Sequence, residues 1–466
     1  MLVTNGDVKP AIVDENEIGD AIRGAGSFDA GRVRDVLARA REARGLSAVD
    51  VAALADVSDP EQLHELFDAA RAVKERIYGR RLVVFAPLYV SNMCGNECLY
   101  CAFRARNRQI ERRALDQDEI RREVEALVDQ GHKRVLLVAG ESYPAEGFDY
   151  ILRSIDTVYS VKKGRGEIRR VNVNTAPLEV EEFRALKARN IGTYQLFQET
   201  YHRETYARVH VGGRKKDYDW RVGAMDRALD AGINDVGIGV LFGLADWRFE
   251  VLAMMQHIRW LEERHGVGPH TVSVPRLEPA AGSDLASQPP HRVSDVEFRK
   301  IVAILRLAVP YTGIIMSTRE TARIRSETFA LGVSQISAGS RTNPGGYVEG
   351  EASGQFSLGD HRPLDEVVRD VAGLGYIPSF CTACYRLGRT GRDFMDLAKP
   401  GDIKAHCDPN ALATFAEYLI DYGSPTTREV GERLIGQAIS DMDEKSRLVA
   451  ERLVGAVRDG RRDVRV

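Results

Sequence analysis

Short apolar runs alternate with longer amphipathic segments along most of this chain. Eight of the short runs have the length and the β-branched or apolar composition of strands. They are Leu82 to Val90, Arg134 to Ala139, Arg170 to Asn174, Thr193 to Gln198, Asp235 to Leu241, Thr271 to Arg276, Gly313 to Ser317 and Ser334 to Ser337. Between them lie segments with helical spacing, including 118–130, 180–189, 218–231, 248–265 and 293–308. The pattern predicts a series of strand–helix units.

Repeated strand–helix units favour parallel pairing with right-handed crossovers. Eight such units close most economically into a (β/α)8 barrel, with an open doubly wound sheet as the alternative. Residues 30–79 precede the first strand and have helical spacing, with Ser58-Asp59-Pro60 as a helix start signal. We therefore expect an α/β protein with a helical N-terminal extension over 1–80, a TIM-like barrel over 81–347 and a C-terminal extension over 348–466.

Composition narrows the class of protein further. The length of 466 residues suits a barrel with extensions, and a hydrophobic content of 44% is ample for its core. A net charge of -3 and a pI near 6.4 argue against a dominant role in binding nucleic acid or membrane. The first 20 residues are polar and acidic, and no stretch has the length of a membrane span. We expect a cytoplasmic protein with neither nucleic acid nor membrane as a partner.

All six cysteines fall into two groups of three. The early group, Cys94, Cys98 and Cys101, has the spacing Cys-x3-Cys-x2-Cys and follows the first predicted strand directly. No cysteine remains for a structural disulfide, so the usage favours metal ligation in a reducing compartment. Three thiolates can bind an iron–sulfur cluster and leave one iron without a protein ligand, whereas structural zinc usually takes four protein ligands. No fourth cysteine or histidine lies nearby in the sequence.

The late group, Cys381, Cys384 and Cys407, has the spacing Cys-x2-Cys-x22-Cys. Three thiolates with this spacing can bind a second cluster. The alternative is a zinc site in which His406 or His361 supplies the fourth ligand.

The early cysteine run, with Tyr100 before its last cysteine, resembles that of the radical S-adenosylmethionine (SAM) superfamily. The resemblance implies a 4Fe-4S cluster on Cys94, Cys98 and Cys101, the catalytic ligands. Its open iron would chelate SAM, and the reduced cluster would break the S–C5' bond to give a 5'-deoxyadenosyl radical. It also implies that the barrel is a radical SAM barrel.

Six further residues are candidates for binding SAM. Ala139-Gly140-Glu141 follows the second predicted strand and resembles the Gly-Gly-Glu motif that holds the SAM amino group. By family pattern, Glu199 and Arg221 suit the ribose and the carboxylate, and a salt bridge between barrel and helix is their alternative. Gly237 and Gly239 offer a flat surface for adenine, or else allow close backbone packing.

Both cysteine groups together, with segments 268–276 (Gly-Pro-His-Thr-Val-Ser-Val-Pro-Arg) and 337–347 (Ser-Ala-Gly-Ser-Arg-Thr-Asn-Pro-Gly-Gly-Tyr), resemble the HydG-type radical SAM tyrosine lyases, which mature FeFe-hydrogenase. The resemblance runs from about residue 30 to about residue 455. The tyrosine lyases of thiazole biosynthesis resemble the barrel portion but lack the late group, and the tryptophan lyases that make indolic acids share only the barrel.

This resemblance implies a reaction at two clusters. The radical takes hydrogen from the amino nitrogen of L-tyrosine, and cleavage of the Cα–Cβ bond releases p-cresol and dehydroglycine. The latter would give carbon monoxide and cyanide near the second, auxiliary cluster, which in the family carries an extra iron. An iron unit with cysteine would then pass to the hydrogenase cofactor. Implied partners are tyrosine, SAM, cysteine, hydrogenase maturation proteins and an electron donor such as ferredoxin or flavodoxin.

The motif match indicates a ligand for the extra iron, and the charge of the substrate indicates residues that bind it. The matching motif makes His270 a ligand of the extra iron, with a capping or core histidine as the alternative. A substrate carboxylate deep in a barrel needs a fixed cation, best supplied by arginine. The candidates are Arg319, Arg325 and Arg341, with Ser337 and Ser340 as hydroxyl donors. The sequence does not choose among the arginines.

Two other functions remain compatible with the sequence. One is a related aromatic amino acid lyase, such as a 2-iminoacetate synthase of thiazole and thiamine biosynthesis, with zinc or an inert cluster in the late group. The other is a non-catalytic iron–sulfur scaffold. For the two-cluster tyrosine lyase, we expect the two cysteine groups at opposite ends of the barrel, unless the late segment folds back over the same end.

Overall fold

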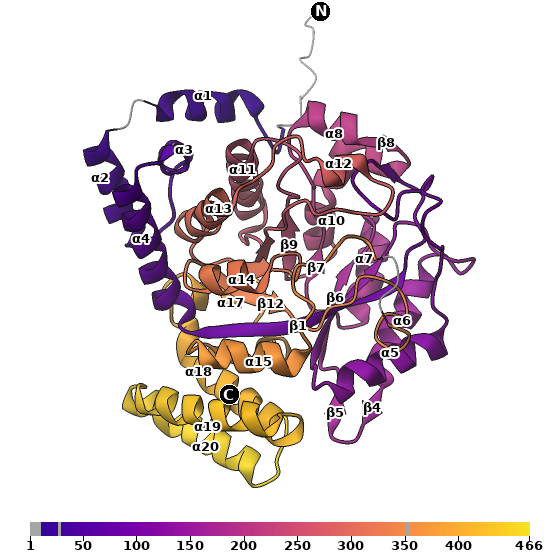
Figure 1. The fold of residues 1–466 in the computed structure, drawn as a ribbon, viewed down its shortest axis with the longest axis vertical. Coiled ribbons are helices and arrows are strands. Elements are labelled where there is room, and N and C mark those ends of the chain that lie inside the picture. The colour runs from indigo at the N-terminus through magenta and orange to yellow at the C-terminus, as the bar shows by residue number, and fades with distance from the viewer. Residues whose placement is uncertain (1–10, 27–28, 351–353) are drawn as a thin grey trace, which may run out of the picture.

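The computed structural model describes residues 11–26, 29–350 and 354–466 (Figure 1). Within these ranges eight parallel strands close into a barrel. They are β1 (Arg81–Ser91), β3 (Arg134–Ala139), β6 (Arg170–Asn174), β7 (Tyr194–Gln195), β9 (Val236–Gly239), β10 (Thr271–Ser273), β11 (Gly313–Met316) and β12 (Val333–Ser337). Neighbouring strands follow chain order, and β12 closes the barrel by pairing with β1, where Gln335 faces Val83. The predicted barrel is confirmed, and the open sheet is excluded.

A ninth strand, which the sequence pattern did not predict, joins the outside of this sheet. β13 (Ile377–Ser379) pairs in parallel with the first residues of β1, so that Arg81 faces Ile377. Three residues with a central proline are too few to show a period of two. The strand ends two residues before Cys381 and so attaches the late cysteine group to the amino end of β1.

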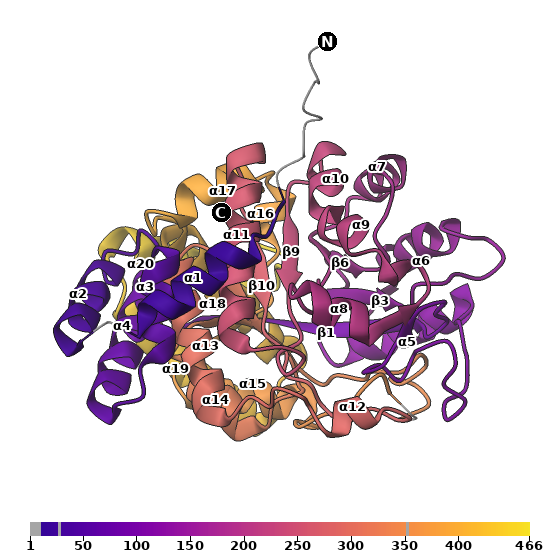
Figure 2. The same ribbon diagram turned by 90° about the horizontal axis from the view of Figure 1, so that it is seen from above.

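Helices surround the barrel and extend it on two sides (Figures 1 and 2). The N-terminal helices α3 and α4 pack on α13, and α18 packs on β13. The helix α4 begins as predicted, because the Asp59 side chain caps it and Pro60 occupies its first turn. The helices are α1 (Glu15–Ala25), α2 (Ala30–Ala40), α3 (Ala48–Asp56), α4 (Pro60–Tyr78), α5 (Gln117–Asp129), α6 (Asp149–Ser160), α7 (Val180–Ala188), α8 (Arg203–Val209), α9 (Tyr218–Val222), α10 (Ala224–Asp230), α11 (Trp247–His265), α12 (Asp284–Ser287), α13 (Asp295–Ala308), α14 (Ala322–Phe329), α15 (Leu364–Gly373), α16 (Ala383–Arg386), α17 (Arg392–Ala398), α18 (Ile403–Asp421), α19 (Pro425–Ser440) and α20 (Glu444–Arg458), with the short 3-10 helix η1 (Arg214–Lys216).

Two small antiparallel pairs complete the secondary structure of the described residues. β4 (Lys162–Lys163) pairs with β5 (Gly166–Glu167) at the periphery. β2 (Glu97–Cys98), which lies within the early cysteine loop, pairs with β8 (His210–Gly212). The second pair therefore connects two loops that are more than a hundred residues apart in the chain.

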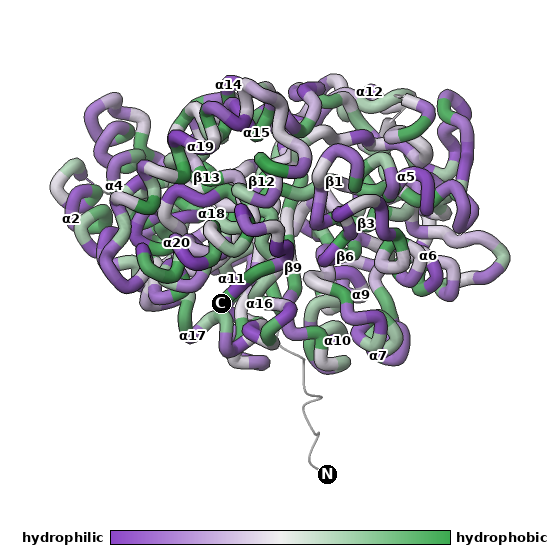
Figure 3. Tube along the Cα trace, turned by 90° about the horizontal axis from the view of Figure 1, so that it is seen from below, coloured by the Kyte–Doolittle hydropathy of each residue, from purple (hydrophilic) through white to green (hydrophobic). Residues whose placement is uncertain are grey.

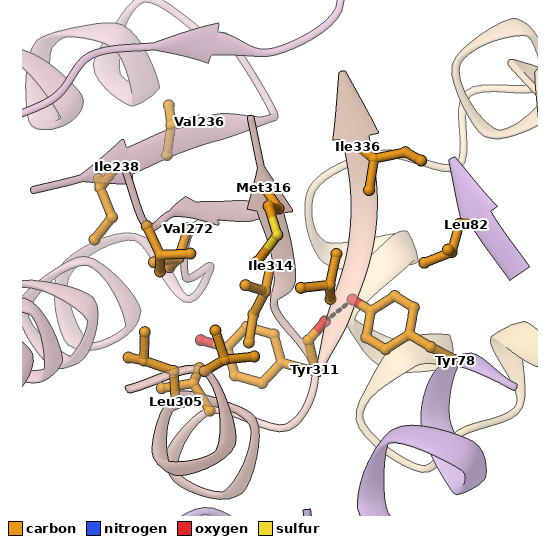
Figure 4. Close-up of a cluster of buried hydrophobic side chains, with 14 of the residues drawn as sticks. Tyr78, Leu82, Val236, Ile238, Val272, Leu305, Tyr311, Ile314, Met316 and Ile336 are labelled. Atoms are coloured by element: carbon orange, nitrogen blue, oxygen red, sulfur yellow. Dashed lines mark hydrogen bonds between the residues drawn. The ribbon is translucent and has the colours of Figure 1, made fainter. Parts of the chain in front are cut away.

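The apolar core lies between the barrel wall and the helices. Val236, Ile238, Val272, Ile314, Met316 and Ile336 alternate along their strands and share this layer with Leu305 of α13 (Figure 4). The Tyr78 hydroxyl donates a hydrogen bond to the carbonyl oxygen of Tyr311 in the same layer. Hydrophobic segments recur along the inner strands, while hydrophilic segments are frequent on the outer loops (Figure 3).

The alternate positions of β9 and β10 face the barrel interior and are small or polar. A Cβ at Gly237 would lie 2.5 Å from Thr271 Oγ1 and 2.9 Å from Gln195 Cγ, so these residues face one another inside. Ordinary barrels fill this space with large branched side chains. Here the interior leaves room for sites at both of its ends.

A buried ion cluster attaches the C-terminal helices to the barrel. Arg169 donates two hydrogen bonds to Glu417 of α18, the shorter of 2.6 Å, and Lys133 Nζ lies 3.3 Å from the same carboxylate. Burial alone would raise the pKa of Glu417, but Arg169 and Lys133 outweigh it and the pKa lies below its ordinary value. Among the described residues, no helix is both long and apolar enough to cross a membrane.

Candidate active site

The early cysteine group lies in a cavity at the carboxyl ends of the barrel strands. Cys94, Cys98 and Cys101 all line it, together with Ser337 at the end of β12. Cys98 belongs to β2 and pairs with His210 of β8, which fixes the middle of the cysteine loop. This is the end of the barrel where sites are expected in the fold.

The donor set of this cavity suits an iron–sulfur cluster. No histidine and no fourth cysteine is among the described residues that line it. Burial raises the pKa of all three thiols, that of Cys101 to about 11, so binding a metal must displace their protons. Three thiolates are the ligands of a cubane with one open iron.

Cys101 receives two hydrogen bonds from neighbouring N–H groups. The backbone N–H of Phe103 lies 3.4 Å from its sulfur, and Nε2 of Gln355 lies 3.7 Å from it. The Tyr89 hydroxyl donates to Oε1 of Gln355 at 2.8 Å and thereby orients the amide. Sequence reasoning did not single out Gln355, because it comes from the long loop after β12 and no motif marks it.

Four charged side chains form a balanced cluster beside the cysteines. Glu141 Oε1 lies 2.9 Å from the Arg221 guanidinium, and Glu199 Oε1 lies 2.7 Å from Lys215 Nζ. Burial would raise the pKa of Glu141, but Arg221 and Lys215 outweigh it and lower the pKa below its ordinary value. Asn96 of the cysteine loop donates to Glu141 Oε2 at 2.7 Å. Glu141 is therefore held ionised at the edge of the cavity.

Lys215 is the member of this cluster that the sequence did not reveal. It stands in the run Arg214-Lys215-Lys216, which has the composition of a solvated turn. In the structure only 8% of the Lys215 side chain is exposed, because the pairing of β2 with β8 brings the turn over the cysteine loop. The contact depends on that long-range pairing and has no local signal.

Gly140 allows the backbone of β3 to approach the cysteine loop closely. Its N–H donates to the Ser91 carbonyl at 2.9 Å, and a Cβ at this position would overlap the carbonyl oxygen of Met93. Two backbone segments meet here, so neither can yield as a flexible side chain would.

We therefore expect Gly140→Ala to destabilise the protein by about 1–3 kcal/mol, the usual cost of overpacking. Gly95→Ala is the matched control in the same loop, since a Cβ there meets nothing within 4 Å. Denaturant titration of the metal-free proteins measures both. Equal midpoints for the two variants would contradict the close approach at Gly140.

Gly237 and Gly239 lie in the barrel wall and do not line the cavity. A Cβ at Gly239 would lie 2.9 Å from the carbonyl oxygen of Ser273, and one at Gly237 would crowd Thr271. These contacts fit the alternative of close packing, and binding of adenine at the two glycines stays a prediction.

The structure separates the candidate substrate residues into two sets. Arg319 and Ser337 line the cavity, and the Arg319 guanidinium stacks on Phe356 with 3.2 Å from Cζ to the ring centroid. Arg319 has no ion-pair partner among the described residues. Arg325 is fully buried, pairs with Asp360 and donates to the Ser337 carbonyl at 2.6 Å.

Ser340 and Arg341 also lie outside the cavity lining. Arg341 Nη1 donates to the Ser340 carbonyl at 2.9 Å. Of the three arginines that the sequence left open, the structure brings only Arg319 to the early cysteines.

The late cysteine group lines a second cavity, at the amino ends of the strands. Cys381, Cys384, Cys407 and His270 line it, with Arg81 at the start of β1. The two cysteine groups therefore lie at opposite ends of the barrel, as expected. His361 and His406, the candidate fourth zinc ligands, are not among its lining residues.

His270 is buried and neutral in this second cavity. Burial lowers its pKa to about 4, the Tyr385 hydroxyl lies 3.1 Å from Nε2, and Asp235 Oδ1 lies 3.8 Å from Nδ1. A neutral imidazole is the form that binds metals. Among the described residues, no three His, Cys, Asp or Glu side chains converge closely enough to hold a metal ion as they stand. The suitability of this cavity for a cluster therefore follows from its donor atoms, which are three thiols and one imidazole.

Comparison with known proteins places the chain in a family. Residues 88–255 match the radical SAM superfamily, and residues 273–377 match the biotin and thiamin synthesis associated domain. A 2-iminoacetate synthase from Salmonella typhimurium is 32% identical over 342 residues, which are 73% of this chain and 88% of the relative.

Two solved structures match nearly the whole chain. A crystal structure of HydG, a maturase of the FeFe-hydrogenase, has a TM-score of 0.95 and 46% identity and covers 98% of this chain and 100% of that one. HydG from Carboxydothermus hydrogenoformans has a TM-score of 0.83 and 40% identity and covers 94% of this chain and 98% of that one. Radical SAM enzymes carry a 4Fe-4S cluster and use SAM. The three thiols of the first cavity suit such a cluster. The chain belongs to the HydG-type family of radical SAM enzymes.

Proposed function

We propose that this protein is a radical SAM lyase that cleaves the Cα–Cβ bond of L-tyrosine to p-cresol and dehydroglycine. The dehydroglycine is converted to carbon monoxide and cyanide for assembly of the FeFe-hydrogenase cofactor. One observation carries the proposal: a single barrel has three cysteines at its carboxyl end and three more, with His270, at its amino end. The match to HydG over nearly the whole chain supports it.

At the carboxyl end, Cys94, Cys98 and Cys101 would hold the 4Fe-4S cluster, which with SAM supplies the 5'-deoxyadenosyl radical. Gly140, Glu141, Glu199 and Arg221 are our candidates for binding SAM, and we add Lys215 because it pairs with Glu199. Glu141 would accept hydrogen bonds from the SAM amino group and Glu199 from its ribose, while Arg221 would pair with the SAM carboxylate. The buried setting keeps water away from a reactive radical.

Arg319 and Ser337 are our candidates for binding tyrosine. A guanidinium that has no anionic partner in a buried cavity is suited to a carboxylate ligand. Burial lowers the pKa of Arg319, as expected for a cation that awaits its counter-ion. The stack on Phe356 fixes the plane of the guanidinium.

We expect Arg319→Leu to raise the KM for tyrosine by about 10- to 100-fold, the range expected for losing a charged hydrogen-bond partner. SAM binding should be unchanged, because Arg319 does not contact the charged cluster around Glu141. Arg341→Leu is the matched control, since Arg341 lies outside the cavity. Steady-state assays of p-cresol measure both variants. An equal effect of the two substitutions would contradict the assignment of Arg319.

At the amino end, Cys381, Cys384 and Cys407 would bind the auxiliary cluster and His270 the extra iron. The barrel interior between the two ends includes the polar side chains Gln195 and Gln335 among apolar ones such as Ile315, and we propose it as the route of the small fragment. We propose cysteine, hydrogenase maturation proteins and a ferredoxin or flavodoxin as partners, in the cytoplasm. We also propose the division into 1–80, 81–347 and 348–466 as functional parts.

The similarity to 2-iminoacetate synthase favours a second candidate function. In that case the chain would release the same tyrosine fragment for thiazole synthesis, and the late cysteine group would hold a structural metal.

Mass-spectrometric product analysis with tyrosine and tryptophan offered separately tests the proposed tyrosine lyase activity. We expect p-cresol and 5'-deoxyadenosine from tyrosine only. A fully loaded protein that cleaves SAM but yields no p-cresol would refute it.

A further inference from the structure

Glu199 occupies a backbone conformation that residues other than glycine rarely adopt. Its φ is 73°, and its carboxylate lies 2.7 Å from Lys215 Nζ in the first cavity. The left-handed region costs free energy for a residue with a Cβ, so it persists only where the surroundings over-determine it. Some part of the structure must therefore hold Glu199 in place.

Helix α11 holds the two residues that follow Glu199. Glu250, near the start of the helix, accepts hydrogen bonds from the Thr200 hydroxyl and, at 2.9 Å, from the Tyr201 N–H. Two helical turns later, His257 Nδ1 lies 2.7 Å from the Tyr201 hydroxyl. Glu250 and His257 are 1% and 2% exposed, so both contacts are shielded from water.

Other elements fix the same segment from further directions. The Tyr218 hydroxyl of α9 donates to the Tyr201 carbonyl at 2.9 Å. The Leu241 N–H donates to the carbonyl oxygen of Glu199 itself at 2.8 Å. The Glu199 carbonyl and the two residues that follow it are thus pinned, and Glu250 makes two of these contacts.

Glu250 acts as a hydrogen-bonding group and not as half of an ion pair. It has no cationic partner among the described residues, and burial raises its pKa to about 7. A protonated carboxyl can still serve both partners, since its O–H can donate to Thr200 Oγ1 while the other oxygen accepts from Tyr201. Because it does not line the cavity, Glu250 reaches a bound ligand only through the backbone of residues 199–201.

We propose that Glu250 is a positioning residue that holds Glu199 in its left-handed conformation and thereby directs the Glu199 carboxylate into the SAM site. This inference rests on the proposed function, in which Glu199 contacts SAM.

The test is equilibrium binding of SAM to the anaerobically reconstituted holoenzyme without tyrosine. Glu250→Leu removes both hydrogen bonds and should weaken SAM binding about tenfold, the scale of one left-handed residue. The KM for SAM should rise alike, while kcat at saturating SAM stays within about twofold. Glu250→Gln should bind SAM like the wild type, because its amide N–H can donate to Thr200 and its oxygen can accept from Tyr201.

Two further variants keep the test decisive. Gln256→Leu is the matched control, because Gln256 is a buried polar residue of the same helix that contacts Asp14 and Glu17 and not the segment 199–201. Thr200→Val removes one of the two contacts and serves if Glu250→Leu does not fold; it should weaken binding about threefold. Wild-type affinity in both Glu250→Leu and Thr200→Val, or equal weakening by Gln256→Leu, would overturn the inference. A wild-type holoenzyme that binds no SAM would refute the proposed function instead.

Discussion

Cys98→Ala is expected to abolish 5'-deoxyadenosine, p-cresol and carbon monoxide together. Cys98 is one of three thiols at the carboxyl end, and no other cysteine or histidine among the described residues lining that cavity can replace it. Without a third ligand the cluster that activates SAM is not held, and every later step depends on it. We expect losses of more than about a thousandfold, the scale of removing an essential catalytic group.

The second cavity provides the internal control for this variant. Iron analysis of Cys98→Ala should retain the portion bound at Cys381, Cys384 and Cys407, because that group lies at the other end of the barrel. Loss of all iron would indicate a folding defect. Retained cleavage of SAM would contradict the assignment of the early cysteines.

Cys384→Ala should separate the two halves of the reaction. We assign tyrosine cleavage to the carboxyl end, so p-cresol should form within about twofold of the wild-type rate, as expected for a distant, independent site. Carbon monoxide should fall to background, because the auxiliary cluster to which we assign conversion of the fragment would no longer be held. Gas-phase detection of carbon monoxide and chromatography of p-cresol from one reaction measure both products.

Cys407→Ala should give the same separation, since Cys407 lines the same cavity.

His270→Ala should lower carbon monoxide release while leaving the auxiliary cluster in place, because we assign His270 to the extra iron alone. Carbon monoxide release that is unchanged in Cys384→Ala would favour a structural metal in the late group and the 2-iminoacetate synthase alternative.

The barrel could be predicted from the sequence because its strands carry a local signal. Runs such as Arg134 to Ala139 are short and apolar, and amphipathic segments of helical length separate them. The strand β13 has only three residues and depends on pairing with β1, so no local pattern marks it. The sequence could show the cysteine groups, because thiol spacing is local information.

The rest of the site depends on contacts between distant segments. Arg319, Arg325 and Arg341 are equivalent in the sequence, and they differ only in what they meet after folding. Asp360 engages Arg325, whereas Arg319 faces the cavity and has no counter-ion within the part of the chain that the structure describes. Lys215 and Gln355 reach the site through a strand pairing and a long loop that composition does not reveal.

The balance of charge beside the cysteines could likewise be found only in the structure. Glu199 and Arg221 were candidates from family pattern, with a structural salt bridge as the alternative. In the structure both belong to one cluster, in which Arg221 lies 2.9 Å from Glu141 and 3.8 Å from Glu199. The salt bridges are therefore present and line the cavity, and binding of SAM by these side chains stays a prediction.

Electron paramagnetic resonance of the reduced, reconstituted protein tests the central claim most directly. We predict two distinct cluster signals, of which one shifts when SAM is added and the other is absent from Cys384→Ala. A single 4Fe-4S signal in the wild type, with zinc bound at Cys381, Cys384 and Cys407, would contradict the account.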